Sequence, residues 1–190
     1  MLITIDLDDV LFNTRPLFKQ AFKQVGQTYT KYNNWDLNLC YDPVVVEQLF
    51  KLFRDDIIYK MPLLDNKIPN ILNNLMQRPD LEICFVTERL IKQPEKTWQQ
   101  LTNAGIKCSF EQVYDREGKK SDILRELKTD LHFDDSPYVI SGCLKKNVPI
   151  VMISNNATLY NHYLRDKVKH YKNLRTALIQ TGIYQLQNKK

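Results

Sequence analysis

Long hydrophobic runs are missing from this chain of 190 residues. No apolar stretch approaches the ~20 residues with which a helix crosses a bilayer, and no signal-like segment precedes the first predicted strand. Internal repeats and low-complexity tracts are missing as well. We therefore expect a cytoplasmic, globular protein that makes no contact with membranes.

Cysteine is scarce, and its spacing excludes the usual cysteine sites. The four cysteines are widely separated and form no Cys-x-x-Cys pair: Cys40, Cys84, Cys108 and Cys143. Most of them lie in apolar segments. We interpret them as reduced packing residues and not as a zinc site or a disulfide framework.

The remaining composition is that of an ordinary soluble protein, with 43% hydrophobic and 26% charged residues. The length suits one core of about 130 residues with a small insertion, because domains typically have ~100–150 residues. The net charge of +5 arises near the C-terminus, where residues 164–190 hold seven Lys or Arg and one acid.

Apolar residues in this basic segment recur at helical spacing, which predicts a C-terminal helix docked on a sheet. Its expected docking face is Leu164, Val168, Tyr171 and Leu178, and its expected outer stripe is Arg165, Lys169 and Lys172. We favour a solvated helix face over contact with a polynucleotide.

The N-terminal strand ends in a dense group of acids. Residues 1–5 are almost entirely apolar and partly β-branched, which is typical of a parallel strand buried on both faces. Asp6, Asp8 and Asp9 follow at the strand's C-terminal edge, where open α/β sheets bind ligands. Residues i and i+2 of an extended segment project to one side, so Asp6 and Asp8 can face one site. A divalent cation would offset their repulsion. The alternative is a simple capped turn, with Asp9 as the cap.

Three further polar signals follow apolar segments. Residues 81–86 read as a strand that ends on Thr87, and residues 131–133 read as one that ends on Asp134 and Asp135. Between them, residues 118–121 open a helix with two lysines near its start. These four signals, in this order, resemble the motifs of the haloacid dehalogenase-like (HAD) phosphohydrolase superfamily over residues 1–154.

The acids suit phosphoryl transfer. A carboxylate can attack phosphorus and form an aspartyl-phosphate, a role that we assign to Asp6. Asp8 would protonate the leaving group and later accept a proton from water. Mg²⁺ prefers oxygen ligands and keeps some waters, so Asp6, the Asp8 carbonyl and Asp134 would suffice to bind it. Asp135 would support this metal site.

The transferred phosphoryl group also needs a hydroxyl donor and a fixed cation. Thr87 and Lys120 are the candidates. Lys119 is the rival lysine, but Lys120 stands four residues before Leu124, which is the spacing usual in the superfamily.

An insertion, residues 13–61, interrupts the alternating order of strands and helices. Residues 15–25 and 43–59 show helical periodicity, and the segment between them is aromatic and rich in turn residues. We predict a small helical cap that excludes water from the strand ends and offers aromatic faces to a substrate. The core domain would then comprise residues 1–12 and 62–190.

A narrower resemblance is to the 5′(3′)-deoxyribonucleotidases. It rests on residues 35–37 (Trp-Asp-Leu), 96–98 (Lys-Thr-Trp), 120–121 (Lys-Ser) and 133–135 (Phe-Asp-Asp). The resemblance implies removal of phosphate from a deoxynucleoside monophosphate whose base stacks on cap aromatics. Phe18, Tyr32 and Trp35 are the candidates, although Phe18 also suits the cap's own core. Arg89 could hold a phosphate or ribose oxygen, or pair with Glu88 or another acid.

We therefore predict a three-layer, Rossmann-like α/β fold with a mainly parallel sheet, right-handed crossovers and a helical cap after the first strand. The expected strands are residues 1–7, 81–87, 107–114, 130–134 and 148–154. The expected activity is Mg²⁺-dependent hydrolysis of small phosphomonoesters, deoxynucleotides first. A polynucleotide 3′-phosphatase and a non-catalytic nucleotide or phosphate binder stay open as alternatives, and so does the oligomeric state.

Overall fold

The computed structural model describes residues 1–28, 37, 41–54, 57–89, 92–115, 117–154 and 163–185. Its centre is a parallel sheet of six strands in the order β3-β2-β1-β4-β5-β6. The strands are β1 (Leu2–Ile5), β2 (Glu82–Val86), β3 (Val113–Tyr114), β4 (Leu131–Asp134), β5 (Ile150–Ile153) and β6 (His170–Tyr171). This arrangement confirms the predicted α/β fold.

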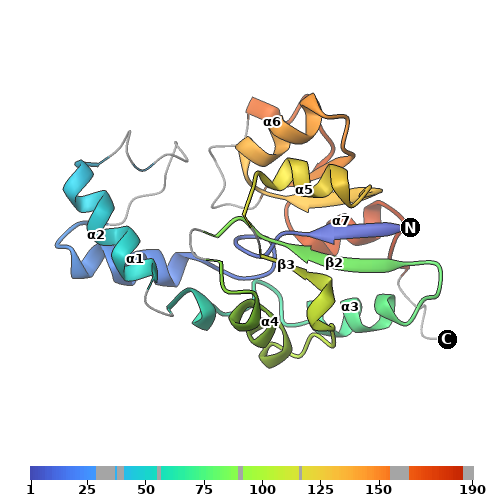
Figure 1. Cartoon of the computed structure of the whole chain (residues 1–190), viewed down its shortest axis with the longest axis horizontal. Helices are drawn as coiled ribbons and strands as arrows, with labels where there is room; N and C mark the ends of the chain where they lie inside the picture. The colour runs from blue at the N-terminus through green and yellow to red at the C-terminus, as the bar shows by residue number, and fades with distance from the viewer. Residues whose placement is uncertain are drawn as a thin grey trace.

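Helices cover both faces of the sheet (Figure 1). Helices α3 (Ile68–Met76), α4 (Pro94–Asn103) and α7 (Leu174–Gln180) pack on one face, and α5 (Lys120–Glu126) and α6 (Pro137–Lys145) pack on the other. Short 3₁₀ turns, η2 (Ile57–Lys60) and η3 (Phe110–Gln112), precede α3 and β3. Strand side chains alternate between the layers: Ile3 and Ile5 join the first core, whereas Ile150 and Met152 join the second. Burial on both faces explains why the strands are nearly continuous apolar runs.

The part of the chain between β1 and α3 forms helices α1 (Arg15–Gln24) and α2 (Pro43–Arg54), which stand to one side of the sheet in Figure 1. They share a small apolar cluster of their own, made of Ala21, Phe22, Leu37, Val46 and Leu49. Phe18 is partly buried against this cluster. Helices and a separate cluster are what a cap requires, and the boundary of a cap subdomain at residues 13–61 stays a prediction.

The C-terminal segment differs from the prediction. Instead of one long helix, residues 163–169 form turns, His170–Tyr171 form the edge strand β6, and α7 begins at Leu174. Asn173 sets that start, because its side chain accepts a hydrogen bond from Thr176 N at 2.8 Å.

The helical spacing that suggested this long helix is a coincidence. Leu164 and Val168 pack in the α5–α6 layer, whereas Tyr171 and Leu178 pack in the opposite one. The predicted basic stripe is therefore an exposed turn and strand edge that carries Arg165, Lys169 and Lys172. The third strand is also shorter than predicted and starts at Val113, because η3 occupies the residues before it.

The cysteines behave as packing residues where they are described. Cys84, Cys108 and Cys143 are buried and unpaired, and Cys40 lies outside the described residues. Among the described segments, every helix is too short or too polar to cross a membrane.

Candidate functional site

The candidate site lies at the C-terminal edge of the two central strands. Ile5 of β1 is in register with Phe133 of β4, and Asp6 N donates to the Phe133 carbonyl at 3.0 Å. The next residue of each strand is therefore an acid, and Asp6 and Asp134 lie side by side. Both are buried, with 5% and 0% of their surface exposed. The sequence predicted this edge from the places where the apolar runs end.

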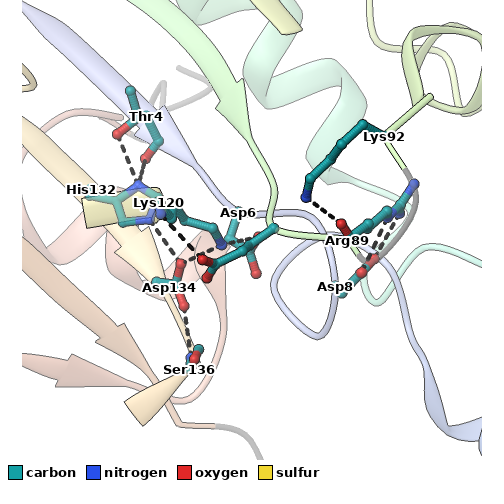
Figure 2. Close-up of polar contacts among 10 residues, drawn as sticks. Thr4, Asp6, Asp8, Arg89, Lys92, Lys120, His132, Asp134 and Ser136 are labelled. Carbon is teal, nitrogen blue, oxygen red and sulfur yellow. Dashed lines mark hydrogen bonds and ion pairs between the residues drawn. The ribbon is translucent and has the colours of Figure 1, made fainter. Parts of the chain in front are cut away.

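Lys120 joins the two acids (Figure 2). Its Nζ lies 2.6 Å from Asp6 Oδ1 and 2.8 Å from Asp134 Oδ2, and its side chain is 3% exposed. Lys119, the rival lysine, is exposed. Burial opposes the charge of Lys120, but Asp134 and Asp6 outweigh it and raise its pKa. Lys120 is therefore a fixed cation at this edge of the sheet.

Close packing between α5 and α6 holds Lys120 in place. A Cβ at Gly142 of α6 would lie 2.8 Å from Ser121 Oγ, the hydroxyl of the residue that follows Lys120. Only glycine allows the two helices to approach this closely at this contact.

His132 is a further residue of the site, and sequence reasoning missed it. It is fully buried, with Nε2 2.9 Å from Asp134 Oδ2 and Nδ1 2.9 Å from Thr4 Oγ1 (Figure 2). Burial lowers its pKa, so the ring is neutral. A carboxylate oxygen can only accept, so Nε2–H donates to Asp134, while Nδ1 lies 2.9 Å from the Thr4 hydroxyl and 3.1 Å from the Thr4 carbonyl oxygen. The available signal was a histidine in an apolar strand, two residues before Asp134 and hence on the same face.

Asp134 is held as a carboxylate. Burial would raise its pKa, but the Lys120 charge and the His132 hydrogen bond lower it to about 2. Its other oxygen, Oδ1, accepts from Ser136 N at 2.7 Å. Every donor around Asp134 thus stabilises its charged form.

The pKa of Asp6 is shifted in the opposite direction. Burial raises its pKa to about 8 in spite of Lys120, and the charges of Asp134 and Asp8 add to the rise. Holding Asp6 and Asp134 both as carboxylates therefore needs more positive charge than the Lys120 ammonium supplies. A bound cation would supply it.

A divalent cation fits this site. Carboxylate oxygens of Asp6, Asp134 and Asp135 lie within 4.8 Å of one another, and all three residues are buried. Carboxylate oxygens are the ligands that Mg²⁺ prefers. The donor set and the missing positive charge therefore both suit Mg²⁺.

Asp8 and Arg89 form a second charged group beside the first (Figure 2). Arg89 Nη2 lies 2.7 Å from Asp8 Oδ1, and Nε lies 3.2 Å from Oδ2. Asp8 is close enough for its charge to raise the pKa of Asp6. Of the partners considered for Arg89, an acid is the one present, and it is Asp8 instead of Glu88.

Asp9 caps the turn that leads into α1. Its backbone is left-handed, with φ of 57°, and its carboxylate accepts from Thr14 N at 3.1 Å and from Thr14 Oγ1 at 2.7 Å. Burial raises the pKa of Asp9, while the Thr14 bonds act against that rise. The turn thus ties the acids after β1 to the helix that follows.

The remaining predicted residues divide into two groups. Thr87 is 2% exposed at the end of β2, next to β1, and its backbone N–H donates to the Tyr114 carbonyl at 3.1 Å. Phe18 is partly buried and packs against the α1–α2 cluster, and its contact with a substrate stays a prediction. Tyr32 and Trp35 lie outside the described residues.

Known proteins match this chain by structure alone. No protein-family model and no curated protein sequence matches it. A HAD-like hydrolase from Streptococcus pneumoniae aligns at a TM-score of 0.64 and 16% identity, over 94% of this chain and 97% of that one. Protein Tyrosine Kinase A from Mycobacterium tuberculosis aligns at 0.65 and 15%, over 95% and 97%. A magnesium-bound HAD-hydrolase from Bacillus subtilis aligns at 0.58 and 11%, over 95% and 98%.

These structural neighbours confirm the resemblance that the four sequence signals predicted, at the level of the fold. At such low identities, the kinase and the hydrolases share an architecture without sharing one activity. This chain has the fold of the HAD-like hydrolases.

Proposed function

We propose that this protein is a Mg²⁺-dependent phosphomonoesterase that works through an aspartyl-phosphate on Asp6. The observation that carries the proposal is the buried cluster in which Lys120 bridges Asp6 and Asp134. Such a cluster is costly to bury, and it has the charge and the oxygen ligands that phosphoryl transfer needs. The magnesium in the Bacillus subtilis neighbour and the grouped carboxylates of Asp6, Asp134 and Asp135 support the choice of metal.

The residues have distinct roles in this mechanism. The Asp6 carboxylate attacks phosphorus, the bond from phosphorus to the leaving oxygen breaks, and that oxygen takes a proton from Asp8. Lys120 and the Thr87 hydroxyl stabilise the charge on the phosphoryl oxygens. Water then attacks the aspartyl-phosphate and gives a proton to Asp8, and phosphate leaves. Bound Mg²⁺ would offset the charge of the acids and of the phosphoryl group.

The substrates that we propose are deoxynucleoside monophosphates. The proposal rests on the sequence resemblance and on the position of α1 and α2, which border the segment that contains Tyr32 and Trp35. Stacking on these aromatics would hold the base, and Phe18 is now better explained as part of the α1–α2 cluster.

A polynucleotide 3′-phosphatase is a second candidate. The basic residues Arg165, Lys169 and Lys172 are exposed beside the edge strand β6. Arg165 Nη2 contacts Ser154 Oγ at 3.4 Å, at the same edge of the sheet as Asp134. A single strand could follow this side of the molecule through phosphate contacts.

A panel of phosphomonoesters tests the proposal. We expect phosphate release that requires Mg²⁺, that favours nucleoside monophosphates, and that Asp6→Asn abolishes, because this change keeps the shape but removes the nucleophilic charge. Nucleotide binding without phosphate release from any ester would support the non-catalytic alternative. Preference for 3′-phosphorylated oligonucleotides, with a steep salt dependence, would support the second candidate.

A further inference from the structure

Arg89 is a buried cation held on two sides. Its side chain is only 2% exposed, and it forms the two-point ion pair with Asp8. Its Cζ lies 5.2 Å from the centroid of the Tyr59 ring, in the turn η2. The Lys92 ammonium donates to the Arg89 carbonyl, which fixes the backbone of the loop. The position of the guanidinium is therefore fixed by several contacts, as expected for a residue of an active site. Its hydrogen-bond partner in this structure is the side chain of Asp8.

The pair with Asp8 uses both oxygens of the carboxylate. In the proposed function, Asp8 must present an oxygen to the leaving group. The Asp8 side chain is 28% exposed, so a substrate can reach it, but both of its oxygens are directed at the guanidinium of Arg89. Catalysis with Asp8 therefore requires this pair to loosen.

Two buried polar atoms of opposite kind lie without a partner in the same region. Among the residues that the structure describes, five buried side-chain atoms have no hydrogen-bond partner, and they include Arg89 Nη1, Asp115 Oδ1 and Gln93 Oε1. Arg89 Nη1 is a donor on a cation, Asp115 Oδ1 is an acceptor on a carboxylate, and Gln93 Oε1 is an acceptor on an uncharged amide. A buried polar atom without a partner is destabilising, so native structures retain few of them, often at functional sites.

Asp115 lies near enough to Arg89 for its charge to act on the guanidinium. It follows β3, and the Thr87–Tyr114 backbone bond joins the ends of β2 and β3 just before the two residues. The other oxygen of Asp115 is anchored by Thr97 Oγ1 at 2.8 Å and by Gln93 N at 3.2 Å. Burial works against the charge of Arg89, yet its pKa is raised, and Asp115 is among the charges that cause the rise.

We propose that Arg89 and Asp115 are positioning residues for Asp8, and that Arg89 moves from Asp8 to Asp115 when substrate binds. The guanidinium exchanges the partly exposed carboxylate of Asp8 for the buried carboxylate of Asp115 and stays over Tyr59, so its buried charge keeps a partner. Asp8 is partly exposed, and the leaving-group oxygen replaces Arg89 as its partner. This inference rests on the proposed phosphomonoesterase activity.

The exchange predicts a dependence on the leaving group. The alkoxide of an alkyl phosphate is a poor leaving group and needs the proton from Asp8. The 4-nitrophenoxide of 4-nitrophenyl phosphate is a good leaving group and hardly needs it. The informative quantity is the alkyl-to-aryl ratio, which is kcat/KM for a nucleoside monophosphate divided by kcat/KM for 4-nitrophenyl phosphate. A change in general stability lowers both values and leaves their ratio unchanged.

The test is a double-mutant cycle on the full chain with Mg²⁺. Asp115→Asn removes the negative charge that would bind Arg89, so Arg89 stays paired with Asp8. We expect the alkyl-to-aryl ratio to fall at least tenfold, a part of the roughly 10²–10⁴-fold that general acid catalysis contributes. Arg89→Met releases Asp8 and should raise the ratio. In the Arg89→Met background, adding Asp115→Asn should leave the alkyl-to-aryl ratio unchanged, because Arg89, the residue through which Asp115 acts, is gone.

Matched variants keep the test decisive. Asp65→Asn breaks another Asp–Arg pair, with Arg175 at 2.9 Å, that includes no residue of the site, and it should leave the ratio at the wild-type value. If Asp115→Asn does not fold, Arg89→Lys still tests the idea. It keeps the charge without the two-point fork, so the ratio should equal or exceed the wild-type value.

Three results would overturn the inference. The first is an equal loss with both substrates in Asp115→Asn, which indicates a structural role. The second is a lower ratio in Arg89→Met or Arg89→Lys, which indicates that Arg89 assists proton transfer by Asp8 instead of keeping Asp8 away from the leaving group. The third is a wild-type protein that hydrolyses neither substrate, which removes the proposed function itself and is recognised before any variant is made.

Discussion

Asp6→Asn should stabilise the metal-free protein at alkaline pH. The pKa of Asp6 is 3.8 in a free chain and about 8 in the folded protein. Between these values the folded state holds a proton that the unfolded state has released. Folding stability therefore falls as the pH rises from about 4 to about 8, by up to roughly 1.4 kcal/mol per pH unit. Asparagine does not titrate, so the variant does not lose this free energy.

The size of the effect follows from that slope. Protonated Asp6 resembles asparagine, so at pH 5, about one pH unit above the free-chain pKa, the variant should be more stable by no more than about 1 kcal/mol. At pH 8 the variant should be more stable by on the order of 2–3 kcal/mol, which is about half of the full linkage, because the protein relaxes around a buried charge. Urea unfolding in EDTA at pH 5, 6.5 and 8 measures this difference.

Asp80→Asn is the control. The hydrogen bond from Arg78 lowers the pKa of Asp80, so this acid is charged at all three pH values and its replacement should have the same effect at each. A difference between Asp6→Asn and the wild type that stays constant from pH 5 to pH 8, or that shrinks, would refute the charge assignment of the Lys120 cluster.

The other predictions concern the metal, the cation and the substrate. Mg²⁺ at 100 times its Kd should stabilise the wild type by about 2.7 kcal/mol, and Asp134→Asn by less, in thermal unfolding. Lys120→Ala should lower kcat by roughly 10²–10³-fold and Lys119→Ala should not, because only Lys120 lies between the acids; the reverse order in steady-state assays would contradict this assignment. Trp35→Ala should raise KM for nucleotides by the equivalent of about 1–3 kcal/mol and spare aryl phosphates; equal KM changes for both would argue against base stacking.

Strand ends were the most predictable part of the site. Buried parallel strands must be apolar along their length, so the first polar residue marks the functional edge. That rule is local and needs no knowledge of the partners. It leads to Asp6, Thr87 and Asp134, and the helix start leads to Lys120.

Contacts between distant loops were not predictable in this way. Arg89 and Asp8 are 81 residues apart, and their pair depends on how two turns lie after β1 and β2. His132 lies within an apolar strand segment, and its partner Thr4 belongs to a different strand, so the sequence gives no sign of their contact. Both interactions depend on how distant segments pack in three dimensions, which the hydrophobic periodicity of the sequence does not predict.

The C-terminal error has a related cause. Four apolar residues at helical spacing predict one buried stripe only if they face one layer. Leu164 and Leu178 face opposite layers of the sheet, so the same spacing arose from a turn, a short edge strand and a separate helix.

The covalent step on Asp6 is the central claim, and rapid quenching tests it directly. The protein is mixed with a ³²P-labelled nucleoside monophosphate and Mg²⁺, quenched in acid within milliseconds, digested, and analysed by mass spectrometry and scintillation counting. The account predicts a labelled, acid-stable acyl phosphate on the peptide that contains Asp6, which Asp6→Asn lacks. Hydrolysis of the substrate at full rate with no label on that peptide, or with the label unchanged in Asp6→Asn, would contradict it.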